Sequence, residues 1–297
     1  MPHPEADSAS VVTVADPITE IAYAKVNLAL HVRRRRDDGF HELESLFVFA
    51  EDGDRLSGFA TDDGMIALSV DGPFGAGLGN GAGNLVSEAA IKLQAFLGER
   101  RGAKLHLFKS LPVASGIGGG SADAAAALRL LVRLWDASVD QIVLERLALE
   151  LGSDVPACLR SVTQRVTGRG EGLEACAIEG LSERPMLLVN PGVAVPTGPV
   201  FAVWDRKDRG ALVAERFDEL VEMGRNDLEN PAIALAPVIS DVLARLRSQA
   251  GVRLARMSGS GATCFALFDD AAQRDAATTN IRAAHPDWWT MATRIKG

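Results

Sequence analysis

The most chemically informative segment of this sequence is a glycine cluster ahead of an apparent helix. Leu111–Leu128 reads LPVASGIGGGSADAAAAL and holds four glycines within five positions. Glycines between a strand and a helix let backbone N–H groups approach an anion, and the helix start adds unpaired donors and the positive end of its dipole. The segment therefore favours a phosphate-binding loop. A glycine loop that serves only close helix packing is the alternative, and the glycines alone do not exclude it.

Three familiar phosphate loops do not fit this cluster. A Walker A loop requires Gly-Lys followed by Ser or Thr, and no such triplet follows the glycines. The dinucleotide pattern GxGxxG fails because position 121 is serine. The VAIK, HRD and DFG motifs of protein kinases do not occur in the sequence.

Two polar side chains that could take part in chemistry lie on a predicted strand near the N-terminus. Glu20–Val32 reads EIAYAKVNLALHV, and its alternating apolar residues predict a strand with one apolar face. Lys25 and Asn27 project from the opposite face of that strand, one step apart. A lysine in this setting is usually exposed.

Asp154 stands at the start of a short predicted helix. In SDVPACL it precedes Pro156, which suits the first helical turn, so Asp154 on its own reads as a helix N-cap.

A hairpin is predicted directly after the first strand. Asp38-Gly39 is a turn signal, and an extended pattern resumes in FHELESLFVFA. Arg33–Arg36 precede this turn. We interpret these four arginines as a solvated hairpin tip beside Asp37 and Asp38, with phosphate binding as the alternative.

The remaining elements predict an α+β protein, because strands and helices mix without strict alternation. An amphipathic helix follows Asn84, and a strand spans about 103–110. Helices are predicted over 121–135 and 139–151, the second with a Ser138–Gln141 capping box and Gly152 at its end. The second half is predicted to hold a buried strand at 185–190, a strand or loop at PVFAVW, a helix, two strands around a glycine turn, another helix and a last strand in WWTMATRI.

Composition limits the class of protein. The chain has 297 residues and a net charge of −8, and a nucleic-acid binder would usually carry a basic surplus. Its three cysteines are widely spaced and odd in number, which argues against a disulfide framework and favours a reducing cytoplasm. Residues 1–19 lack the features of a signal peptide and are expected to form a flexible tail. No apolar run is long enough to span a bilayer.

Four segments carry a resemblance to a known family. The glycine segment resembles the second motif of the GHMP kinases, P-x-x-x-G-[LI]-G-G-G-S-[SA]-[ND]-A-A. AKVNLALHV, DGFHELESLF and LGSDVPACL resemble one branch of that family. Further agreement lies in Gly83–Ala90, Asn190–Phe201, Asn226–Glu229 and Arg256–Phe268, in the family's order from about Ile21 to Phe268.

The resemblance implies an activity and a fold. This branch transfers the ATP γ-phosphoryl group to the 2-hydroxyl of 4-(cytidine 5′-diphospho)-2-C-methyl-D-erythritol in non-mevalonate isoprenoid precursor biosynthesis. The implied fold has an N-terminal domain like domain 2 of ribosomal protein S5, over 20–178, and a ferredoxin-like C-terminal domain, over 179–297. The implied cofactors are ATP and Mg²⁺, with no metal ligands assigned. A monomer or homodimer is expected, with no nucleic-acid or membrane partner.

The resemblance also implies roles for residues at the ATP end. Asp154 matches the proposed general base, and Lys25 matches a lysine that would keep it ionised and stabilise charge on the transferring oxygens. Asn84, Leu85 and Lys109 match positions near the adenosine. The implied phosphate cradle consists of Pro112, Val113, Ala114, Ser115, Gly116, Ile117, Gly118, Gly119, Gly120, Ser121 and Ala122. Ser121 is expected either near the phosphates or metal or as the helix cap.

Other residues are implied at the alcohol end. Phe40, His41 and Phe47 are expected around the cytidine, because aromatic faces stack on a pyrimidine and histidine can hydrogen-bond its edge. Asn27 and Thr197 are expected at the substrate phosphate or sugar. Backbone at Gly259 and Gly261 is expected to close over the site. Asp123 stands where many relatives have asparagine, and the resemblance gives it no role.

Three rival functions stay open at this point. A sister kinase of the same family would act on another small alcohol, such as homoserine or mevalonate. An inactive nucleotide sensor is disfavoured because both Lys25 and Asp154 are present. A dinucleotide-dependent oxidoreductase is the most distant alternative.

Overall fold

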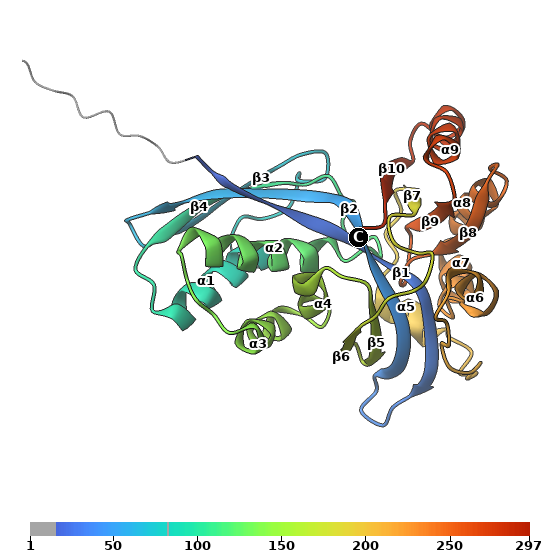
Figure 1. Ribbon diagram of the computed structural model, residues 1–297, viewed down its shortest axis with the longest axis horizontal. Helices are drawn as coiled ribbons and strands as arrows, with labels where there is room; N and C mark the ends of the chain where they lie inside the picture. Colours follow the sequence, from blue (N-terminus) through green and yellow to red (C-terminus); the bar gives the residue numbers. More distant parts are fainter. Residues whose placement is uncertain (1–15, 82) are drawn as a thin grey trace, which may run out of the picture.

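The computed structural model describes residues 16–81 and 83–297, and it divides into two sheets joined by one long hairpin (Figure 1). Strand β1 (Ile18–Arg35) pairs antiparallel with β2 (His41–Thr61) along most of their length. The turn between them contains Asp38-Gly39, so the predicted hairpin is confirmed. The predicted tail of residues 1–19 falls mainly outside the described residues, and Ile18 and Thr19 already belong to β1.

The first sheet has six strands. β2 pairs with β4 (Gly102–Phe108) and β5 (Gln164–Gly168); β3 (Ile66–Asp71) and β6 (Gly172–Ala175) form the edges. Figure 1 shows the helices gathered on one side of this sheet. They are α1 (Leu85–Leu97), α2 (Gly119–Leu134), α3 (Gln141–Leu151) and α4 (Val155–Arg160).

Helix α2 is the central helix of this half. Ala124–Ala127 are completely buried, and the helix contacts β1 and β2 as well as α1, α3 and α4. Alanine favours the helix and lets neighbouring elements approach closely. The alanine run after the glycines thus fixes the start of α2 deep inside the molecule.

The second sheet has four antiparallel strands in the order β10-β7-β9-β8. These strands are β7 (Pro185–Asn190), β8 (Val252–Met257), β9 (Cys264–Phe268) and β10 (Trp289–Arg294). The accompanying helices are α5 (Thr197–Ala202), α6 (Phe217–Met223), α7 (Glu229–Leu235), α8 (Val238–Arg247) and α9 (Ala271–Ala284). Numbered along this half, the strands follow the order 4-1-3-2, which is the ferredoxin-like arrangement. The predicted two-domain α+β fold is confirmed, and the expected boundary at 178/179 falls between β6 and β7.

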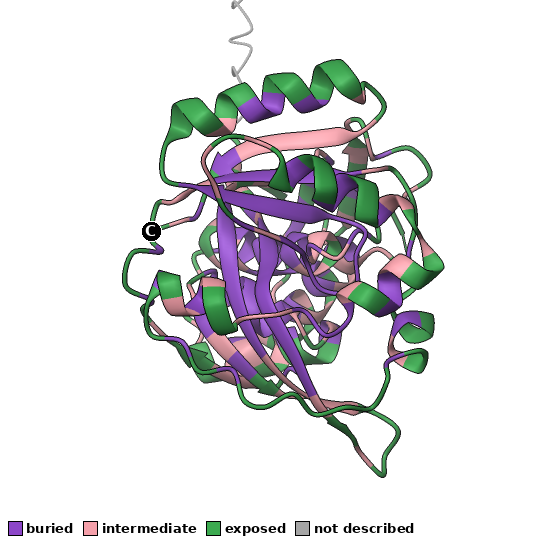
Figure 2. Cartoon of the chain, turned by 90° about the vertical axis from the view of Figure 1, so that its right-hand side faces the viewer, coloured by how far each residue is buried: buried purple, intermediate pink, exposed green. Residues whose placement is uncertain are grey.

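The first strand is buried on both faces, so the prediction of a single apolar face is wrong. All residues from Ala24 to Val32 are buried, including Lys25, Asn27 and His31. The hairpin runs through the centre of the molecule (Figure 2). The N-terminal part of β1 packs against α2, and its middle contacts the C-terminal half, where Leu30 exchanges backbone hydrogen bonds with Arg225 and Asp227.

Several predicted element ends are also corrected. Helix α3 is capped by Asp140, whose carboxylate accepts from the Ile142 N–H, and not by Ser138. Helix α2 begins at Gly119, two residues earlier than predicted, with Gly118 as its N-cap. PVFAVW lies largely in helix α5. Gly152 does end α3 as predicted. Among the described residues, no helix has the length and apolar character needed to cross a bilayer.

Candidate active site

Lys25 and Asp154 form an ion pair at the centre of the molecule. The Lys25 Nζ lies 3.2 Å from an Asp154 carboxylate oxygen. The lysine side chain is 6% exposed and the aspartate side chain 32% exposed, so the carboxylate is the member of the pair that meets solvent. Asp154 occupies the N-cap position of α4 but makes no side-chain capping hydrogen bond. Its carboxylate therefore serves the lysine and the open side of the site instead.

The burial of Lys25 is compensated by polar and aromatic partners. Its ammonium donates to Asn27 Oδ1 at 2.9 Å and lies 4.3 Å from the centre of the Phe47 ring. Asn27 in turn donates from Nδ2 to Ser45 Oγ at 2.9 Å. A buried charge is tolerated when it is paired and hydrogen-bonded, so these residues fix the position of the ammonium.

The glycine loop packs directly against this lysine. The Lys25 N–H donates to the Ile117 carbonyl at 3.0 Å. Gly118 has a φ of 63°, and a Cβ atom there would lie only 3.0 Å from Lys25 Cε. A side chain at position 118 would therefore displace Lys25 or the loop. At this position glycine is required by close approach and by the left-handed backbone.

A second glycine loop locks the first one. Ser258 Oγ accepts from the Asn27 N–H at 3.1 Å and donates to the Gly116 carbonyl at 2.9 Å. A Cβ at Gly116 would lie 2.5 Å from the Ser258 carbonyl oxygen. The segment around Gly259 and Gly261 thus holds the glycine loop from the side of the C-terminal domain.

The start of α2 offers backbone donors to an anion. This helix has 16 residues, and its N-cap Gly118 makes no side-chain capping bond. The first N–H groups of a helix have no intrahelical partner and lie at the positive end of its dipole. Ser121 is in the first turn and is not the cap. The loop therefore has the chemistry of a phosphate site.

A cavity of about 190 Å³ lies beside this loop. It contains most of the residues expected at the ATP end. From the sequence predictions, those that line it are Asn84, Leu85, Lys109, Pro112, Val113, Ala114, Gly119 and Gly120. Asn84 also caps α1, because its Oδ1 accepts from the Val86 N–H at 3.0 Å. We name this space the loop cavity.

A buried ion cluster forms part of the wall of the loop cavity. The Lys109 ammonium donates to Asp54 and, at 2.5 Å, to Asp123. Asp54 also accepts from the N–H groups of Ser110 and Leu111, at 2.5 and 2.8 Å. Lys109 is therefore enclosed and anchors the chain that leads into the loop. Sequence analysis missed Asp54 and gave Asp123 no role, because nothing local links them to Lys109.

The ionisation of Asp123 is shifted by its surroundings. Burial raises the pKa of Asp123 to about 7, with Lys109 opposing the rise and the Asp54 carboxylate adding to it. Its second oxygen is buried and has no hydrogen-bond partner among the described residues. Asp123 thus lines the loop cavity as a member of the buried cluster with Lys109 and Asp54.

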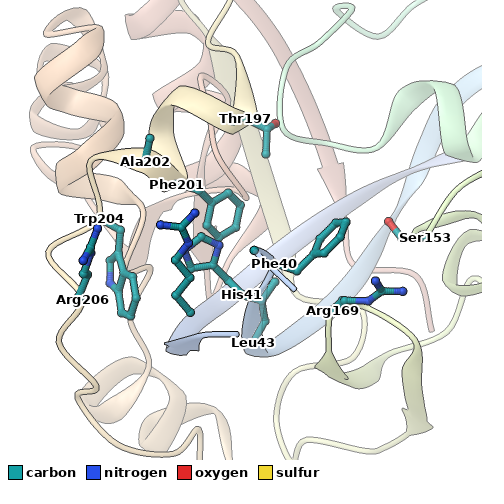
Figure 3. Close-up of a pocket in the computed structure, with 13 residues that line it drawn as sticks. Phe40, His41, Leu43, Ser153, Arg169, Thr197, Phe201, Ala202, Trp204 and Arg206 are labelled. Carbon is teal, nitrogen blue, oxygen red and sulfur yellow. The ribbon is translucent and has the colours of Figure 1, made fainter. Parts of the chain in front are cut away.

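A larger cavity, of about 500 Å³, lies at the turn of the β1–β2 hairpin (Figure 3). Phe40, His41 and Thr197 line it, as expected for the alcohol end, and so does Ser153, the neighbour of Asp154. The Thr197 hydroxyl lies 2.9 Å from the Ser260 hydroxyl. We name this space the hairpin cavity, because the turn of the β1–β2 hairpin forms one wall.

The aromatic side chains of the hairpin cavity differ from the expected set. Phe47 does not line it, since its side chain is buried beneath Lys25. His41 instead stacks on Phe201, with ring centroids 4.7 Å apart, and meets Trp204 edge-on at 5.6 Å. Burial, and then the Arg35 charge, lower the pKa of His41. A neutral imidazole beside aromatic faces suits a heterocyclic base. Sequence analysis missed Phe201 and Trp204, although Phe201 ends one of its matching segments.

Among the described residues, no group of side chains suited to hold a metal ion lies beside these residues. Within residues 16–81 and 83–297, no three His, Cys, Asp or Glu side chains are grouped so as to hold an ion. The three cysteines are unpaired, and burial raises the pKa of Cys158, near Asp154, to about 12. That thiol is thus an inert part of the core.

Comparison with known proteins assigns the chain to a family. The chain matches the family model of the GHMP kinases N terminal domain over residues 84–161 and that of the GHMP kinases C terminal over 209–287. It is 53% identical to the 4-diphosphocytidyl-2-C-methyl-D-erythritol kinase of Rhizorhabdus wittichii, covering 94% of each chain. It is 48% identical to the protein of the same name from Sphingopyxis alaskensis, covering 93% of this chain and 98% of that one.

Solved structures give the same result at the level of the fold. A crystal structure of 4-(cytidine 5′-diphospho)-2C-methyl-D-erythritol kinase aligns with a TM-score of 0.79 at 34% identity, covering 94% of this chain and all of that one. Homoserine kinase from Cytophaga hutchinsonii aligns with a TM-score of 0.73 at 18% identity, covering 96% and 97% of the two chains. The second match shows a shared fold only.

Proposed function

The chain belongs to the GHMP kinase family, among its 4-diphosphocytidyl-2-C-methyl-D-erythritol kinases, and we propose that Lys25 and Asp154 carry its reaction. It is a small-molecule kinase of non-mevalonate isoprenoid precursor biosynthesis. Its reaction is transfer of the ATP γ-phosphoryl group to the 2-hydroxyl of 4-(cytidine 5′-diphospho)-2-C-methyl-D-erythritol. In this proposal the aspartate accepts the proton of the substrate hydroxyl, and the lysine offsets negative charge on the transferring group.

One observation carries the assignment: residues that adjoin the Lys25–Asp154 pair line both cavities. On one side, Gly118 packs against Lys25. On the other, Ser153 brings the hairpin cavity to the residue next to Asp154. A nucleotide in the loop cavity and an alcohol in the hairpin cavity would therefore meet at this pair. Holding both reactants in line is the main requirement for phosphoryl transfer.

In the proposed reaction the substrate 2-hydroxyl donates a hydrogen bond to the Asp154 carboxylate. The alcohol oxygen forms a bond to the γ-phosphorus as the bond from that phosphorus to the β–γ bridging oxygen breaks, which releases ADP. Asp154 accepts the hydroxyl proton. The Lys25 ammonium, 3.2 Å from Asp154, pairs with the carboxylate and offsets negative charge on the transferring group.

The backbone supplies the rest of the phosphate site. We assign Pro112–Ala122 to the ATP phosphates, with donors from the first turn of α2. Asn84, Leu85 and the backbone at Lys109 border the adenosine. Asn27 is assigned a supporting role, since both ends of its amide are already bound to Lys25 and Ser45. Phe47 likewise supports the lysine.

The alcohol substrate is assigned to the hairpin cavity. Phe40, His41 and Phe201 would surround the cytosine ring, and Thr197 would face the sugar or diphosphate. This arrangement favours a substrate with an aromatic base over homoserine or mevalonate, which have no ring to stack.

The residues fit a magnesium ion that enters with ATP. Mg²⁺ is usually held by substrate phosphates and one or two protein oxygens, so a large protein cluster is unnecessary. Ser121, in the first turn of α2, offers such an oxygen. When bound, the ion would neutralise charge on the β- and γ-phosphates.

A coupled assay of ADP release tests the function. The purified chain is supplied with ATP, Mg²⁺ and one of three alcohols: the cytidine diphosphate derivative, homoserine or mevalonate. We expect turnover only with the first. A preference for either of the others would overturn the substrate assignment, and ATP binding without turnover on any of them would favour a nucleotide sensor.

Three further points belong to this proposal. The chain would act in a reducing cytoplasm, which its unpaired cysteines support. It would work as a monomer or homodimer, because both cavities and the reactive pair come from one chain. The domain boundary is placed at 178/179, between the two sheets.

A further inference from the structure

The charged side chains of the hairpin cavity are all positive. Arg35, Arg169 and Arg206 line it, and no acidic residue does. They come from three separate places: the end of β1, the turn between β5 and β6, and the segment after α5. In a chain with a net charge of −8, such a local surplus is notable because it has to be built against the overall charge.

The neighbouring arginines form ion pairs with nearby carboxylates. Arg33 pairs with Glu44 and Asp208, and Arg34 pairs with Glu42. Arg36 likewise pairs with Asp38, and Arg209 pairs with Asp205.

The three cavity arginines differ from these neighbours. In the part of the chain that the structure describes, none of them has a carboxylate within ion-pair distance. The residues outside the cavity are thus the paired ones, and those lining it keep their charge open to a ligand.

Arg169 is already held in a binding geometry. Its guanidinium lies 4.6 Å from the centre of the Phe40 ring. A guanidinium over an aromatic face keeps its N–H donors free, and those donors form a fork that matches paired phosphate oxygens. Phe40 therefore orients Arg169 before any ligand binds.

The arginines flank the cavity on opposite sides. In Figure 3, Arg169 lies with Phe40 and Ser153 on one side, and Arg206 lies with Trp204 on the other, with His41 and Phe201 between them. Arg35 is close enough to His41 for its charge to act on the imidazole. A ligand that fills the space between the arginines meets positive charge from both sides.

We propose that Arg35, Arg169 and Arg206 are specificity-determining residues that select the diphosphate-bearing form of the alcohol. This inference rests on the proposed function. The substrate's pyrophosphate diester carries two negative charges, which homoserine and mevalonate do not offer at a matching place. Arginine recognises phosphate through paired, charge-assisted hydrogen bonds, and it keeps its charge at any working pH.

Steady-state kinetics of charge-neutralised variants test the proposal. Arg35→Gln, Arg169→Gln and Arg206→Gln, singly and together, are compared with Arg34→Gln, whose side chain is exposed and paired to Glu42 outside the cavity. Loss of one charge-assisted hydrogen bond is expected to raise KM for the cytidine diphosphate alcohol about tenfold. The kcat and the KM for ATP stay within about twofold, and Arg34→Gln behaves as wild type. An unchanged KM in the triple variant would overturn the proposal.

A binding measurement separates this proposal from the proposed function. Calorimetry with an ATP analogue present compares CDP with cytidine as probes of the hairpin cavity. We expect wild type to prefer CDP, and the triple variant to lose most of that preference while its affinity for cytidine is little changed. An equal CDP preference in both proteins would contradict the role of the arginines, even if the wild type turns over its substrate. If wild type fails to phosphorylate the alcohol, the proposed function fails whatever CDP does.

Discussion

The two cavities of the active site treat basic side chains in opposite ways. Beside the loop cavity, Lys109 is buried and enclosed by Asp54 and Asp123. Around the hairpin cavity, Arg35 and Arg169 are exposed and have no carboxylate partner among the described residues. The charge of Lys109 is paired within the protein, and the charges of the two arginines remain unpaired and accessible to a ligand.

This contrast shows where each cavity takes its positive potential from. With Lys109 enclosed, the glycine loop has to attract phosphate through backbone N–H groups and the dipole of α2. The hairpin cavity instead presents guanidinium groups. On the proposed assignment, a chain with a net charge of −8 would thus bind two anionic ligands by separate means. Loss of a charged side chain beside the loop cavity should therefore mainly affect folding, and loss of one at the hairpin cavity should mainly affect binding.

Asp54→Ala is expected to cause the largest loss of stability. It tests the enclosed charges beside the loop cavity. The substitution leaves Lys109 with a single carboxylate and removes the acceptor for two backbone N–H groups. Breaking a buried ion pair costs about 3–5 kcal/mol of unfolding free energy. Denaturant unfolding measures the loss. Arg169→Gln, at an exposed site, should change stability by no more than about 0.5 kcal/mol, and equal losses in the two variants would contradict the contrast.

Asp154→Asn and Lys25→Ala test the ion pair that adjoins both cavities. Each should lower kcat by about 10²-fold or more, because one removes the proton acceptor and the other the ammonium beside it. Rapid-quench measurement of phosphoryl transfer with both substrates saturating isolates this step. Circular dichroism checks that each variant is folded. Near-normal turnover by folded Asp154→Asn protein would remove the base assignment.

Gly118→Ala tests the close packing of the glycine loop against Lys25. The added methyl group would lie 3.0 Å from Lys25 Cε at a residue whose φ is 63°. A left-handed backbone costs an alanine about 1–2 kcal/mol, and the crowding displaces Lys25, so we expect kcat to fall about tenfold. Gly81→Ala is the matched control, since a Cβ there meets nothing within 4 Å. If the two variants have the same kcat, close approach is not the reason for the glycine.

Two pH dependences of opposite sign are also expected, one at each cavity. Burial raises the pKa of Asp123 to about 7, so the folded state holds a proton that the unfolded state has already lost. Stability from this group is complete at low pH and is lost as pH rises from about 4 to about 7. For His41, burial and Arg35 lower the pKa, so its contribution is present above about 6.5 and is lost as pH falls through the lowered value.

Unfolding curves across pH measure both effects. Asp123→Asn should flatten the loss on the rising side, and His41→Gln should flatten the loss on the acidic side. If Asp123→Asn leaves the pH profile of the wild type intact, the buried carboxyl does not titrate as its surroundings indicate.

The sequence alone predicts the parts of the site that lie within single segments. The glycine loop, Lys25 and Asp154 each stand in a short motif, and the order of these motifs predicts the family. The ferredoxin-like half follows from the same resemblance, and the strand order confirms it.

Features that depend on distant partners were not predictable. Asp54 and Asp123 are 55 and 14 residues from Lys109, and only the packing of α2 against the sheet brings the three together. Likewise, four consecutive arginines look equivalent in the sequence. Their separation into paired and unpaired members depends on strand register and on acidic residues such as Asp208, far along the chain.

The most direct test of the central claim is a crystal structure with both ligands bound. The protein is crystallised with 4-(cytidine 5′-diphospho)-2-C-methyl-D-erythritol, Mg²⁺ and a non-hydrolysable ATP analogue. We predict the analogue's phosphates on the backbone of residues 116–120, the cytidine diphosphate in the hairpin cavity, and the 2-hydroxyl within hydrogen-bond distance of Asp154 and in line with the γ-phosphate. An alcohol bound away from the hairpin cavity, or a 2-hydroxyl that does not reach Asp154, would contradict the account.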